Sequence, residues 1–552
     1  MNLDQHLQNL TRQKIPSDLE RILDMPRQGP QDGQEAADYW NTALGLGGAS
    51  LRPEQALALS VIEKRRGGFF MYGVGFGKTL IALLAGTAAG SRSPVVLVPP
   101  ALVKQMEQEA VKWSRFFKFR TPAVVSYGLL STRRGLLEEL KPDLIIADEA
   151  HNLKDKKSVK TRRFLRYFNR NPRCGFVALS GTMTSKSLLD YAHLLELSLR
   201  ERAPIPFNRY ELERWAACVD PDGEPNQSDL NRLSYLVQWA HPSKLTPTNK
   251  ETIRSAYRTR LTTTPGVLAT VRSSCDASLI MQHHKPRHTQ AIKDALKTLR
   301  EKWEKPDGEP IADASQASAT FKNLCTGFYY RWDWGENGPD LEWLEAKRHL
   351  NRLIGKVLRY SPREGRDSPA LVTDWSRNGG GTQELREAVR LWDEVGKRPG
   401  PKNVAVWLCQ EKLKYALQYA YNSSDPVLLW YSSNALGSSL ARLGVDVRGA
   451  GSLPPSGGLA ACSIAVHGAG RNLQMYRKCL VIEPPASGSI WEQLLGRTHR
   501  SGQQADAVQW DFMDYAGSVA KAKTHAEYVE QTTGTRQKLN YATILTTGQK
   551  AT

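Results

Sequence analysis

The fold is decided by the stretch YGVGFGKT, residues 72–79, which lies between two apolar runs. Gly68–Met71 precedes it and Leu80–Leu84 follows it. We therefore predict a buried strand, a glycine-rich turn and a helix, which together form a phosphate-binding loop. The core Gly-x-Gly-x-Gly-Lys-Thr is complete over Gly73–Thr79, although Tyr72 stands where the full pattern has glycine. The alternative is a tight strand-to-helix turn with a solvated lysine.

The residue types in this loop suit the binding of phosphate and magnesium. Gly73, Gly75 and Gly77 allow backbone N–H groups to close around phosphate oxygens, and the helix N-terminus adds positive potential. Lys78 can reach the outer phosphates, and the Thr79 hydroxyl can bind Mg²⁺. The sequence thus predicts a nucleotide site.

A pair of carboxylates follows another apolar strand. The strand Asp143–Ala147 runs directly into DEAH at Asp148–His151. Ligands of open parallel sheets bind at the C-terminal ends of the strands, so carboxylates at this position face the same edge as a phosphate loop. We expect Asp148 to hold the magnesium ion and Glu149 to take the proton of the attacking water. The alternative is an acidic surface turn.

The segments around these motifs predict one parallel-sheet domain. Apolar runs at 94–100, 124–127 and 177–182 alternate with helix-like segments, as is typical of α/β domains. Upstream, LRPEQ at 51–55 ends in Gln55, shortly before the phosphate loop. The amide of Gln55 offers one donor and one acceptor, which suits the edge of an adenine.

The α/β pattern returns after residue 400 without a second phosphate loop. Val427–Tyr431, Cys462–Val466 and Cys479–Ile482 are predicted strands, and Val404–Trp407 is a candidate strand or helix. We therefore predict a second parallel-sheet domain.

An arginine motif is the most informative part of this second domain. Residues 491–503 read WEQLLGRTHRSGQ, in which Arg497 and Arg500 are three residues apart. One helical turn separates residues at this spacing, so we expect both guanidinium groups to point in one direction. Guanidinium groups stay charged and bind phosphate oxygens bidentately. Supplied from a second domain, they would complete the nucleotide site as arginine fingers when the domains close.

The composition points to a polyanionic partner. Lysine and arginine outnumber the acids by 75 to 56, which gives a formal charge of +19. A surplus of this size favours nucleic acid held through its phosphates, the alternative being a basic protein without such a partner. Nine basic residues lie between Lys154 and Arg173, and they form either a nucleic-acid track or an ordinary solvated helix face.

The same composition indicates a cytoplasmic protein without a membrane partner. No apolar run approaches the length that spans a bilayer, and the N-terminus lacks the pattern of a secretion signal. The seven cysteines are scattered without a Cys-x-x-Cys pair, so we expect reduced thiols and neither a disulfide framework nor a zinc site.

The chain is longer than one hydrophobic core usually supports. We divide it into a lead-in, a first lobe, a mainly helical region, a second lobe and a helical tail, at 1–48, 49–200, 201–400, 401–515 and 516–552. In the helical region, His283 and His284 are expected to be a surface pair. The aromatic stretch Phe328–Trp332 either packs against helices or stacks on bases.

Taken in order, these motifs resemble the helicase motifs of superfamily 2. The matching segments are LRPEQ, the phosphate loop, Pro99–Pro100, DEAH, Ser180–Thr182, Gly468–Gln474 and Gln493–Gln503. The closing form Gln-x-x-Gly-Arg-x-His-Arg-x-Gly-Gln is similar to the Snf2-like branch, and Asn472–Gln474 points the same way. The resemblance covers residues 50–200 and 400–515.

The resemblance implies an α/β fold of two RecA-like parallel-sheet lobes with a helical region inserted between them, ATP and Mg²⁺ between the lobes, and nucleic acid across both. By this resemblance, Gln55 would read adenine, and Gly73, Gly75, Gly77, Lys78, Thr79 and Asp148 would hold phosphates and magnesium. Catalysis would fall to Lys78, Glu149, Arg497 and Arg500, and coupling or nucleic-acid contact to His151, Ser180, Thr182, Gly470, Asn472 and Gln493.

The chain is more compact than chromatin-remodelling relatives, which carry large helical additions. In this it looks like helicase-type proteins of bacteriophages and prophages. The segments Thr263–Val267 and Cys325–Tyr329 also look like those of such proteins. This resemblance places the protein in the cytoplasm of a bacterium or phage-infected host. We predict an ATP-dependent motor, helicase or duplex translocase, on duplex or single-stranded DNA. A monomer is favoured, with replication or recombination proteins as further candidate partners. Two alternatives stay open: an ATP-gated switch or scaffold, and an RNA-directed motor.

Overall fold

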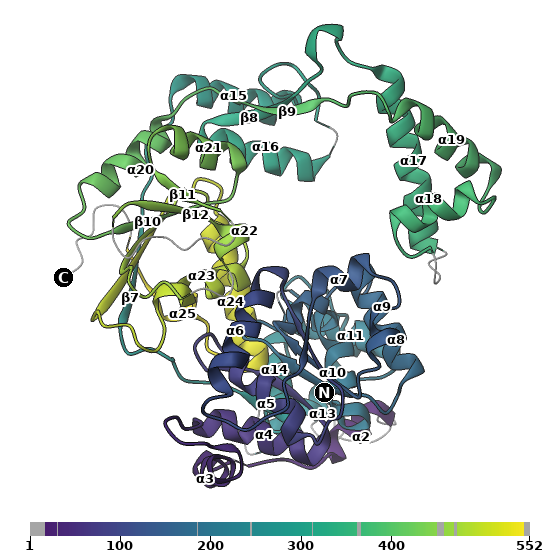
Figure 1. Cartoon of the computed structure of the whole chain (residues 1–552), viewed down its shortest axis with the longest axis vertical. Helices are drawn as coiled ribbons and strands as arrows, with labels where there is room; N and C mark the ends of the chain where they lie inside the picture. The colour runs from purple at the N-terminus through teal and green to yellow at the C-terminus, as the bar shows by residue number, and fades with distance from the viewer. Residues whose placement is uncertain are drawn as a thin grey trace, which may run out of the picture. The chain divides into compact units, whose positions relative to one another are not determined.

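The computed structural model describes residues 17–29, 31–184, 186–242, 246–311, 313–360, 366–449, 458–468 and 472–545. The chain forms two compact units, Met1–His284 with Ser423–Thr552, and Lys285–Asn422 (Figure 1). The first unit contains two all-parallel sheets, so the protein is of the α/β class. We call the first sheet with its helices lobe 1, and the second sheet with its helices lobe 2.

The sheet of lobe 1 has six strands in the order β3-β2-β4-β5-β1-β6. Its strands are β1 (Gly67–Met71), β2 (Pro94–Val98), β3 (Ala123–Ser126), β4 (Leu144–Asp148), β5 (Gly175–Leu179) and β6 (Val267–Ala269). In the register of the sheet, Asp148 at the end of β4 pairs with Leu179 at the end of β5. The segments that follow β1, β4 and β5 therefore leave the sheet at one edge.

Both faces of this sheet are covered, because apolar side chains of its strands are buried on each face. Phe69 and Ile145 belong to one buried cluster, and their neighbours Phe70 and Ile146 belong to the opposite one. The helices on the second face are α3 (Gly33–Leu44), α4 (Pro53–Arg65), α5 (Lys78–Ala88) and α6 (Val103–Trp113). Those on the first face include α9 (Val159–Arg170), α10 (Ala192–Leu199), α11 (Arg209–Val219) and α14 (Lys250–Thr262). Two covered faces are typical of parallel sheets built from strand-helix units.

The sheet of lobe 2 has seven strands in the order β11-β12-β10-β13-β14-β7-β15. They are β7 (Ser278–His283), β10 (Val427–Tyr431), β11 (Asp446–Arg448), β12 (Ala460–Ser463), β13 (Lys478–Val481), β14 (Ala507–Phe512) and β15 (Thr543–Leu545). Three buried tryptophans lie at its centre, with the rings of Trp430 and Trp510 stacked 5.8 Å apart and Trp491 edge-on to Trp510. The two sheets are consistent with tandem RecA-like domains.

Residues 201–400, expected as one helical region, divide into three parts. Helices α11, α12 (Gln227–Arg232), α13 (Ser234–Ala240) and α14 pack into the core of lobe 1. Strand β7 joins lobe 2 between β14 and β15. The remainder lies in the second compact unit, which extends to Asn422. Amphipathic helices have the same sequence pattern whether they cover a sheet or each other, so sequence alone does not assign them to a core.

The second unit contains helices and a two-stranded antiparallel sheet of β8 (Phe328–Asp333) and β9 (Lys402–Trp407). Its helices are α15 (Gln290–Lys302), α16 (Ala314–Thr326), α17 (Leu341–Tyr360), α18 (Pro369–Arg377), α19 (Gln383–Val395) and α20 (Glu411–Tyr421). Of the aromatic stretch in β8, Tyr329 packs into a helical core, whereas Trp332 is 44% exposed. The segment at 404–407, left open between strand and helix, is thus a strand outside the sheet of lobe 2.

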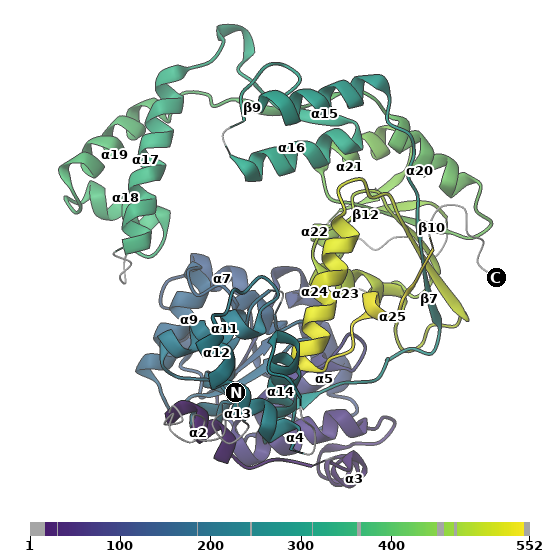
Figure 2. The ribbon, with the colours of Figure 1, turned by 180° about the vertical axis from the view of Figure 1, so that it is seen from behind.

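The C-terminal segment connects the lobes rather than forming a separate tail. Helix α24 (Ser518–Thr533) packs against α14 of lobe 1 and α23 (Gly488–Thr498) of lobe 2, and it lies beside α14 in both views (Figures 1 and 2). A short helix, α25 (Lys538–Tyr541), and β15 follow it.

The seven cysteines are free, and five of them are buried. Across the described ranges, no group of three or more His, Cys, Asp and Glu side chains could hold a metal ion. Helices long and apolar enough to cross a membrane are likewise not found in the part of the chain that the structure covers.

Candidate nucleotide site between the lobes

The predicted phosphate loop follows β1 and leads into α5. Gly75 and Gly77 have φ angles of +96° and +72°, a left-handed conformation that side chains disfavour. Tyr72, the departure from the motif, is not in this conformation and is 2% exposed. Its hydroxyl donates to the carbonyl of Glu54 at 2.7 Å. The tyrosine is therefore accommodated because its position needs no left-handed backbone and its ring is buried.

Lys78 is held inside this loop. Its ammonium group is buried and donates to the carbonyl oxygens of Tyr72 at 2.9 Å and Gly73 at 3.1 Å. The lysine charge also acts to lower the pKa of Asp148, the last residue of β4, and of Glu149, which follows it. Thr79 is half-buried in the first turn of α5. The loop thus presents a positive group at the edge of the sheet where the carboxylates lie.

In the DEAH segment Asp148 is buried and Glu149 is half-buried, and their pKa values move in opposite directions. Burial and the charge of Glu149 raise the pKa of Asp148 to about 7. Burial also acts to raise the pKa of Glu149, but Lys78, His151 and Arg497 outweigh it and hold the value at about 2. Adjacent carboxylates that share one low-dielectric site cannot both ionise easily without a cation. The pair therefore fits the divalent ion that the sequence predicts.

The backbone of Glu149 is also unusual. Its φ is +56°, in the left-handed region, and it is one of five non-glycine residues with positive φ in the described chain. Such a conformation costs free energy and persists where the surrounding structure demands it. Here it follows the last residue of β4 and precedes a short 3₁₀ turn at Ala150–Leu153. The carboxylate that leaves this turn lies beside Ser180 and His151.

A network of polar side chains joins Glu149 to the segment after β5. His151 Nδ1 lies 3.0 Å from Ser180 Oγ, and the Ser180 hydroxyl donates to Glu149 Oε2 at 3.4 Å. His151 Nδ1 is also 3.4 Å from Glu149 Oε2. The backbone N–H of Thr182 donates to Ser180 Oγ at 3.1 Å. The structure therefore brings these predicted coupling residues together around the carboxylate.

Gln55 lies against the phosphate loop. Its Oε1 accepts from the backbone N–H of Arg52 at 2.9 Å, and its Nε2 donates to the carbonyl of Gly77 at 3.3 Å. A Cβ added to Gly77 would lie 2.1 Å from that Nε2, so it would displace the end of the Gln55 side chain, and the positive φ also favours glycine. Both functions of the amide are engaged locally, which places Gln55 beside the loop.

Arg497 reaches the site from lobe 2. The side chain lies in the last turn of α23 and is buried, and its Nε donates to the carbonyl of Gln493 at 2.8 Å. Burial and neighbouring Arg500 lower the pKa of Arg497 to about 10, whereas the charge of Glu149 acts to raise it. The charge of Glu149 in lobe 1 thus acts on Arg497 in lobe 2.

Arg500 lies differently from the expected helical pair. Helix α23 ends at Thr498, and the N–H of Arg500 donates to the carbonyl of Thr498 at 3.2 Å in the turn beyond it. Burial lowers the pKa of Arg500. The charge of Glu109 acts to raise this pKa, and the charge of Arg52 acts to lower it further. The prediction that one helical turn carries both arginines is thus wrong, because the backbone leaves the helical conformation at His499, with φ −88° and ψ +81°.

Two of the remaining predicted residues, Asn472 and Gln493, lie in lobe 2. Asn472 is exposed, and its Oδ1 accepts from the N–H of Gln474 at 3.4 Å. Gln493 is half-buried on α23. Gly470 lies outside the described residues.

Several residues that sequence reasoning did not select also contact the phosphate loop. Thr270 Oγ1 accepts from the N–H of Gly73 at 2.9 Å, and the Ser274 hydroxyl donates to the carbonyl of Val74 at 2.7 Å. Arg52 Nη1 donates to the carbonyl of Gly75 at 2.9 Å. Thr270 and Ser274 lie about 200 residues further along the chain, and no local pattern marks them. Arg52 is part of the LRPEQ motif, so the sequence could have identified it as a residue near the loop.

Gly496 marks a close approach between the lobes. A Cβ added to this residue of α23 would lie 2.4 Å from Val74 Cγ1, inside the phosphate loop. Nearby, Arg52 Nη2 of lobe 1 donates to the Ser501 hydroxyl of lobe 2 at 3.3 Å. The arginine motif of lobe 2 is therefore packed directly on the loop.

The basic helix α9 is an ordinary amphipathic helix in its packing. Phe164 and Phe168 are buried, as the periodicity predicts. Arg163 is also buried, and its Nη1 donates to the carbonyls of Leu130 at 3.1 Å and Ser131 at 3.0 Å. This arginine is structural, while the other basic side chains leave both interpretations open.

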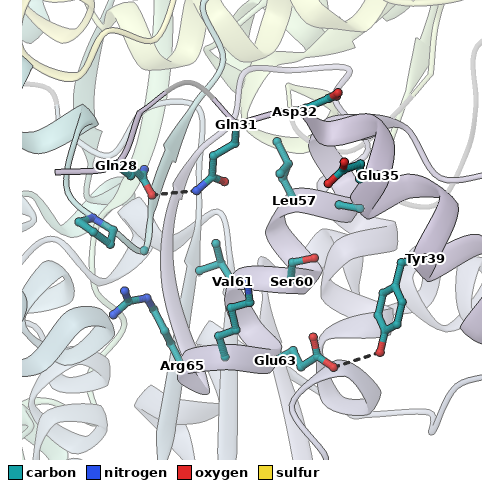
Figure 3. A pocket seen from close by; sticks show the side chains of 14 residues that line it. Gln28, Gln31, Asp32, Glu35, Tyr39, Leu57, Ser60, Val61, Glu63 and Arg65 are labelled. Atoms are coloured by element: carbon teal, nitrogen blue, oxygen red, sulfur yellow. Dashed lines mark hydrogen bonds between the residues drawn. The ribbon is translucent and has the colours of Figure 1, made fainter. Parts of the chain in front are cut away.

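A separate pocket of about 630 Å³ lies at the opposite edge of the lobe 1 sheet (Figure 3). It is lined by Lys64 and Arg65, which precede β1, and by Pro265 and Gly266, which precede β6. The phosphate loop follows β1, so the pocket and the loop are at opposite ends of the strand. Tyr39 donates to Glu63 across one side of the pocket at 3.4 Å. This pocket is therefore distinct from the candidate nucleotide site.

Comparisons with known proteins leave the family open. No protein-family model matches the chain, and no curated protein matches it either. The fold and the site are thus the basis for any functional conclusion.

Proposed function

We propose that this protein is an ATP-dependent DNA motor, a helicase or duplex translocase of the Snf2-like branch of helicase superfamily 2. Two observations support it: the order of the sequence motifs, and the presence of a phosphate loop in one parallel-sheet lobe beside an arginine motif in the other. An ATP site completed by two lobes can convert nucleotide binding and release into relative movement of the lobes.

The interaction between Arg497 and Glu149 carries the proposal. The arginine belongs to lobe 2 and the carboxylate to lobe 1, yet each shifts the pKa of the other. A glutamate that is ionised at neutral pH can accept a hydrogen bond from water and take its proton. A guanidinium supplied from the opposite lobe can stabilise the charge that develops during phosphoryl transfer. A base in one lobe and a guanidinium in the other would thus tie phosphoryl transfer to the approach of the lobes.

The residues around this pair suit ATP and magnesium. Lys78 and the backbone of Gly73–Thr79 would hold the phosphates, and Thr79 and Asp148 would hold the metal ion. Bound Mg²⁺ neutralises charge on the phosphate oxygens. Gln55, beside Gly77, would orient the adenine.

DNA is the proposed track because of the formal charge of +19, which favours a polyanion. RNA has the same phosphate backbone, so an RNA-directed motor is the first alternative. An ATP-gated switch or scaffold is the second. The retention of Glu149, Arg497 and Arg500 argues against a switch, since a switch needs neither a base nor arginine fingers.

Steady-state ATP hydrolysis is the test. The purified protein is assayed alone and with single-stranded DNA, blunt duplex DNA and RNA, beside Lys78→Ala and Glu149→Gln. Matched controls are Lys64→Ala and Glu63→Gln, which make the same changes at exposed positions near the opposite edge of the sheet. We expect DNA to stimulate hydrolysis, both site variants to lose it by at least 100-fold, and both controls to retain it.

The pattern of stimulation distinguishes the alternatives. Duplex stimulation supports a translocase, and stimulation mainly by single strands supports a strand-separating helicase. Stimulation by RNA alone would replace DNA as the track. Hydrolysis that no nucleic acid stimulates would refute the motor and favour the ATP-gated switch.

A further inference from the structure

The segment Thr535–Lys538, which follows α24 and ends at the first residue of α25, contacts both lobes. Thr535, Gln537 and Lys538 are 0%, 1% and 3% exposed, which is unusual for polar side chains in a loop. Buried polar groups persist where they form specific hydrogen bonds. Their partners therefore indicate what this segment does.

Three hydrogen bonds connect the segment to lobe 1. The Thr535 hydroxyl donates to the carbonyl of Met71 at 3.1 Å, at the end of β1. The N–H of Arg536 donates to the carbonyl of Thr270 at 3.3 Å, just after β6. Gln537 Nε2 donates to the carbonyl of Gly181 at 3.2 Å, just after β5. All three acceptors lie at the edge of the sheet that carries the phosphate loop.

Two further contacts connect the segment to the arginine motif of lobe 2. The N–H of Lys538 donates to Glu492 Oε2 at 2.6 Å, and Lys538 Nζ lies 3.2 Å from His499 Nδ1. Glu492 and His499 lie on either side of Arg497 in the sequence. Four consecutive residues thus contact the strand ends around the ATP site and the motif that carries the candidate finger.

The contact to Gly181 leads directly to Glu149. Gly181 follows Ser180, whose hydroxyl donates to Glu149 Oε2. A Cβ added to Gly181 would lie 3.0 Å from the carbonyl oxygen of Tyr72 and 3.1 Å from Gly73 Cα, so this peptide is packed against the phosphate loop. Holding the carbonyl of Gly181 therefore fixes the position of the serine that contacts the carboxylate.

The amide of Gln537 is only partly satisfied. Its Nε2 donates to Gly181 and to the carbonyl of Thr535 at 3.1 Å, but its Oε1 is buried with no hydrogen-bond partner among the described residues. A buried acceptor without a partner is destabilising. An apolar residue of the same size would avoid this penalty, so stability alone does not explain a glutamine here.

We propose that Thr535–Lys538 couples the position of lobe 2 to the ATP site, and that Gln537 is the positioning residue of this segment. Through Gly181 and Ser180, Gln537 holds Glu149 in a fixed position relative to Arg497, so that hydrolysis depends on the position of the lobes. This inference rests on the proposed ATP hydrolysis. Gln537 acts through other residues and does not itself contact the reacting atoms.

The test compares Gln537→Leu with Gln531→Leu. Leucine is close to glutamine in size and removes the donor. Gln531 is an exposed glutamine of α24 whose Oε1 accepts from Arg254 Nη1 of lobe 1 at 2.7 Å, so its substitution also removes a bond between the C-terminal segment and lobe 1. We expect Gln537→Leu to lower the DNA-stimulated kcat at least tenfold, with KM for ATP within twofold of wild type. Gln531→Leu should leave both values unchanged.

A second measurement does not depend on hydrolysis. Hydrogen exchange of backbone amides is compared in wild type and both variants, and in Thr535→Val, which removes the hydroxyl with little change in shape. We expect faster exchange at 180–184 in Gln537→Leu and near Met71 in Thr535→Val, with no change in Gln531→Leu. A structural defect would instead lower the melting temperature and speed exchange throughout the lobe.

These readouts separate two failures. If wild type hydrolyses no ATP with any nucleic acid, the proposed function fails, and exchange still decides whether the segment controls Gly181. If hydrolysis is normal and Gln537→Leu changes neither kcat nor local exchange, the coupling inference is overturned while the proposed function stands. A loss of kcat with unchanged exchange would also overturn it, because the effect would not pass through Gly181.

Discussion

Replacing Gly496 with alanine tests how closely α23 is packed on the phosphate loop. The added Cβ would lie 2.4 Å from Val74 Cγ1, 2.8 Å from its Cβ and 3.2 Å from Cγ2. Carbon atoms in good contact are about 3.5–4.0 Å apart, so the helix or the loop must move by about 1 Å. Val74 cannot turn away freely, because a β-branched side chain is stiff at χ1.

The magnitude follows from two opposing effects. Overpacking of this kind costs about 1–3 kcal/mol. Alanine also favours a helix over glycine by about 0.8–1.0 kcal/mol, which offsets part of that cost. If closure of the lobes precedes hydrolysis, a penalty of about 1–3 kcal/mol on the closed state lowers the DNA-stimulated rate roughly 5- to 150-fold.

Gly355→Ala is the control for helix propensity. Gly355 lies inside α17, where an added Cβ would meet nothing within 4 Å. This variant should gain up to about 1 kcal/mol of stability without losing activity. Hydrolysis rate and melting temperature are measured for both variants.

A second substitution identifies the contact itself. Val74→Ala removes both γ-methyl groups but leaves the Cβ contact at 2.8 Å, so it should restore part of the activity of Gly496→Ala. Wild-type hydrolysis and melting temperature in Gly496→Ala would refute the reasoning. A defect that Val74→Ala does not relieve would show that the alanine acts elsewhere.

Three further predictions follow from single residues. Burial lowers the pKa of both His193 and His499 to about 4, so the unfolded chain binds more protons than the folded chain below pH 6.5. The free energy of unfolding should therefore fall between pH 6.5 and 4 by up to about 3 kcal/mol per histidine. Urea titrations of His193→Asn and His499→Asn should show a shallower decline with pH. Tyr72→Gly restores the full loop motif but removes a buried ring, so chemical denaturation should show that the free energy of unfolding falls by about 3–5 kcal/mol. Equilibrium titration should show no gain in ATP affinity. Glu149→Gly relieves the left-handed backbone and should raise the melting temperature while hydrolysis is lost; a lower melting temperature would mean that burial of the side chain outweighs the strain.

Much of lobe 1 was predictable from sequence, because its signals are local. A phosphate loop needs only the eight residues that form it, and the DEAH carboxylates follow an apolar strand that is visible in five residues. The strands expected at 94–100 and 177–182 are β2 and β5, with shifted ends. Where a strand and its motif are contiguous, the short-range sequence pattern is enough to predict both.

Two parts of the structure differ from what the sequence predicted, for different reasons. Strand β7 pairs in parallel with β14, with more than 200 residues between them, and nothing in Ser278–His283 specifies that partner. The helical spacing expected for Arg497 and Arg500 was wrong because the helix ends at Thr498, and helix ends are the least reliable part of a sequence prediction.

The sequence by itself determined the chemistry: which residues could bind phosphate, hold a metal ion, accept a proton or supply a guanidinium. Only the tertiary structure decided which of them meet. Thr535 contacts Met71 across 464 positions of chain, and Gly496 packs on Val74 from the other lobe. The reason is physical: a motif specifies groups within a few residues, whereas contacts between lobes depend on how two separately formed sheets pack together.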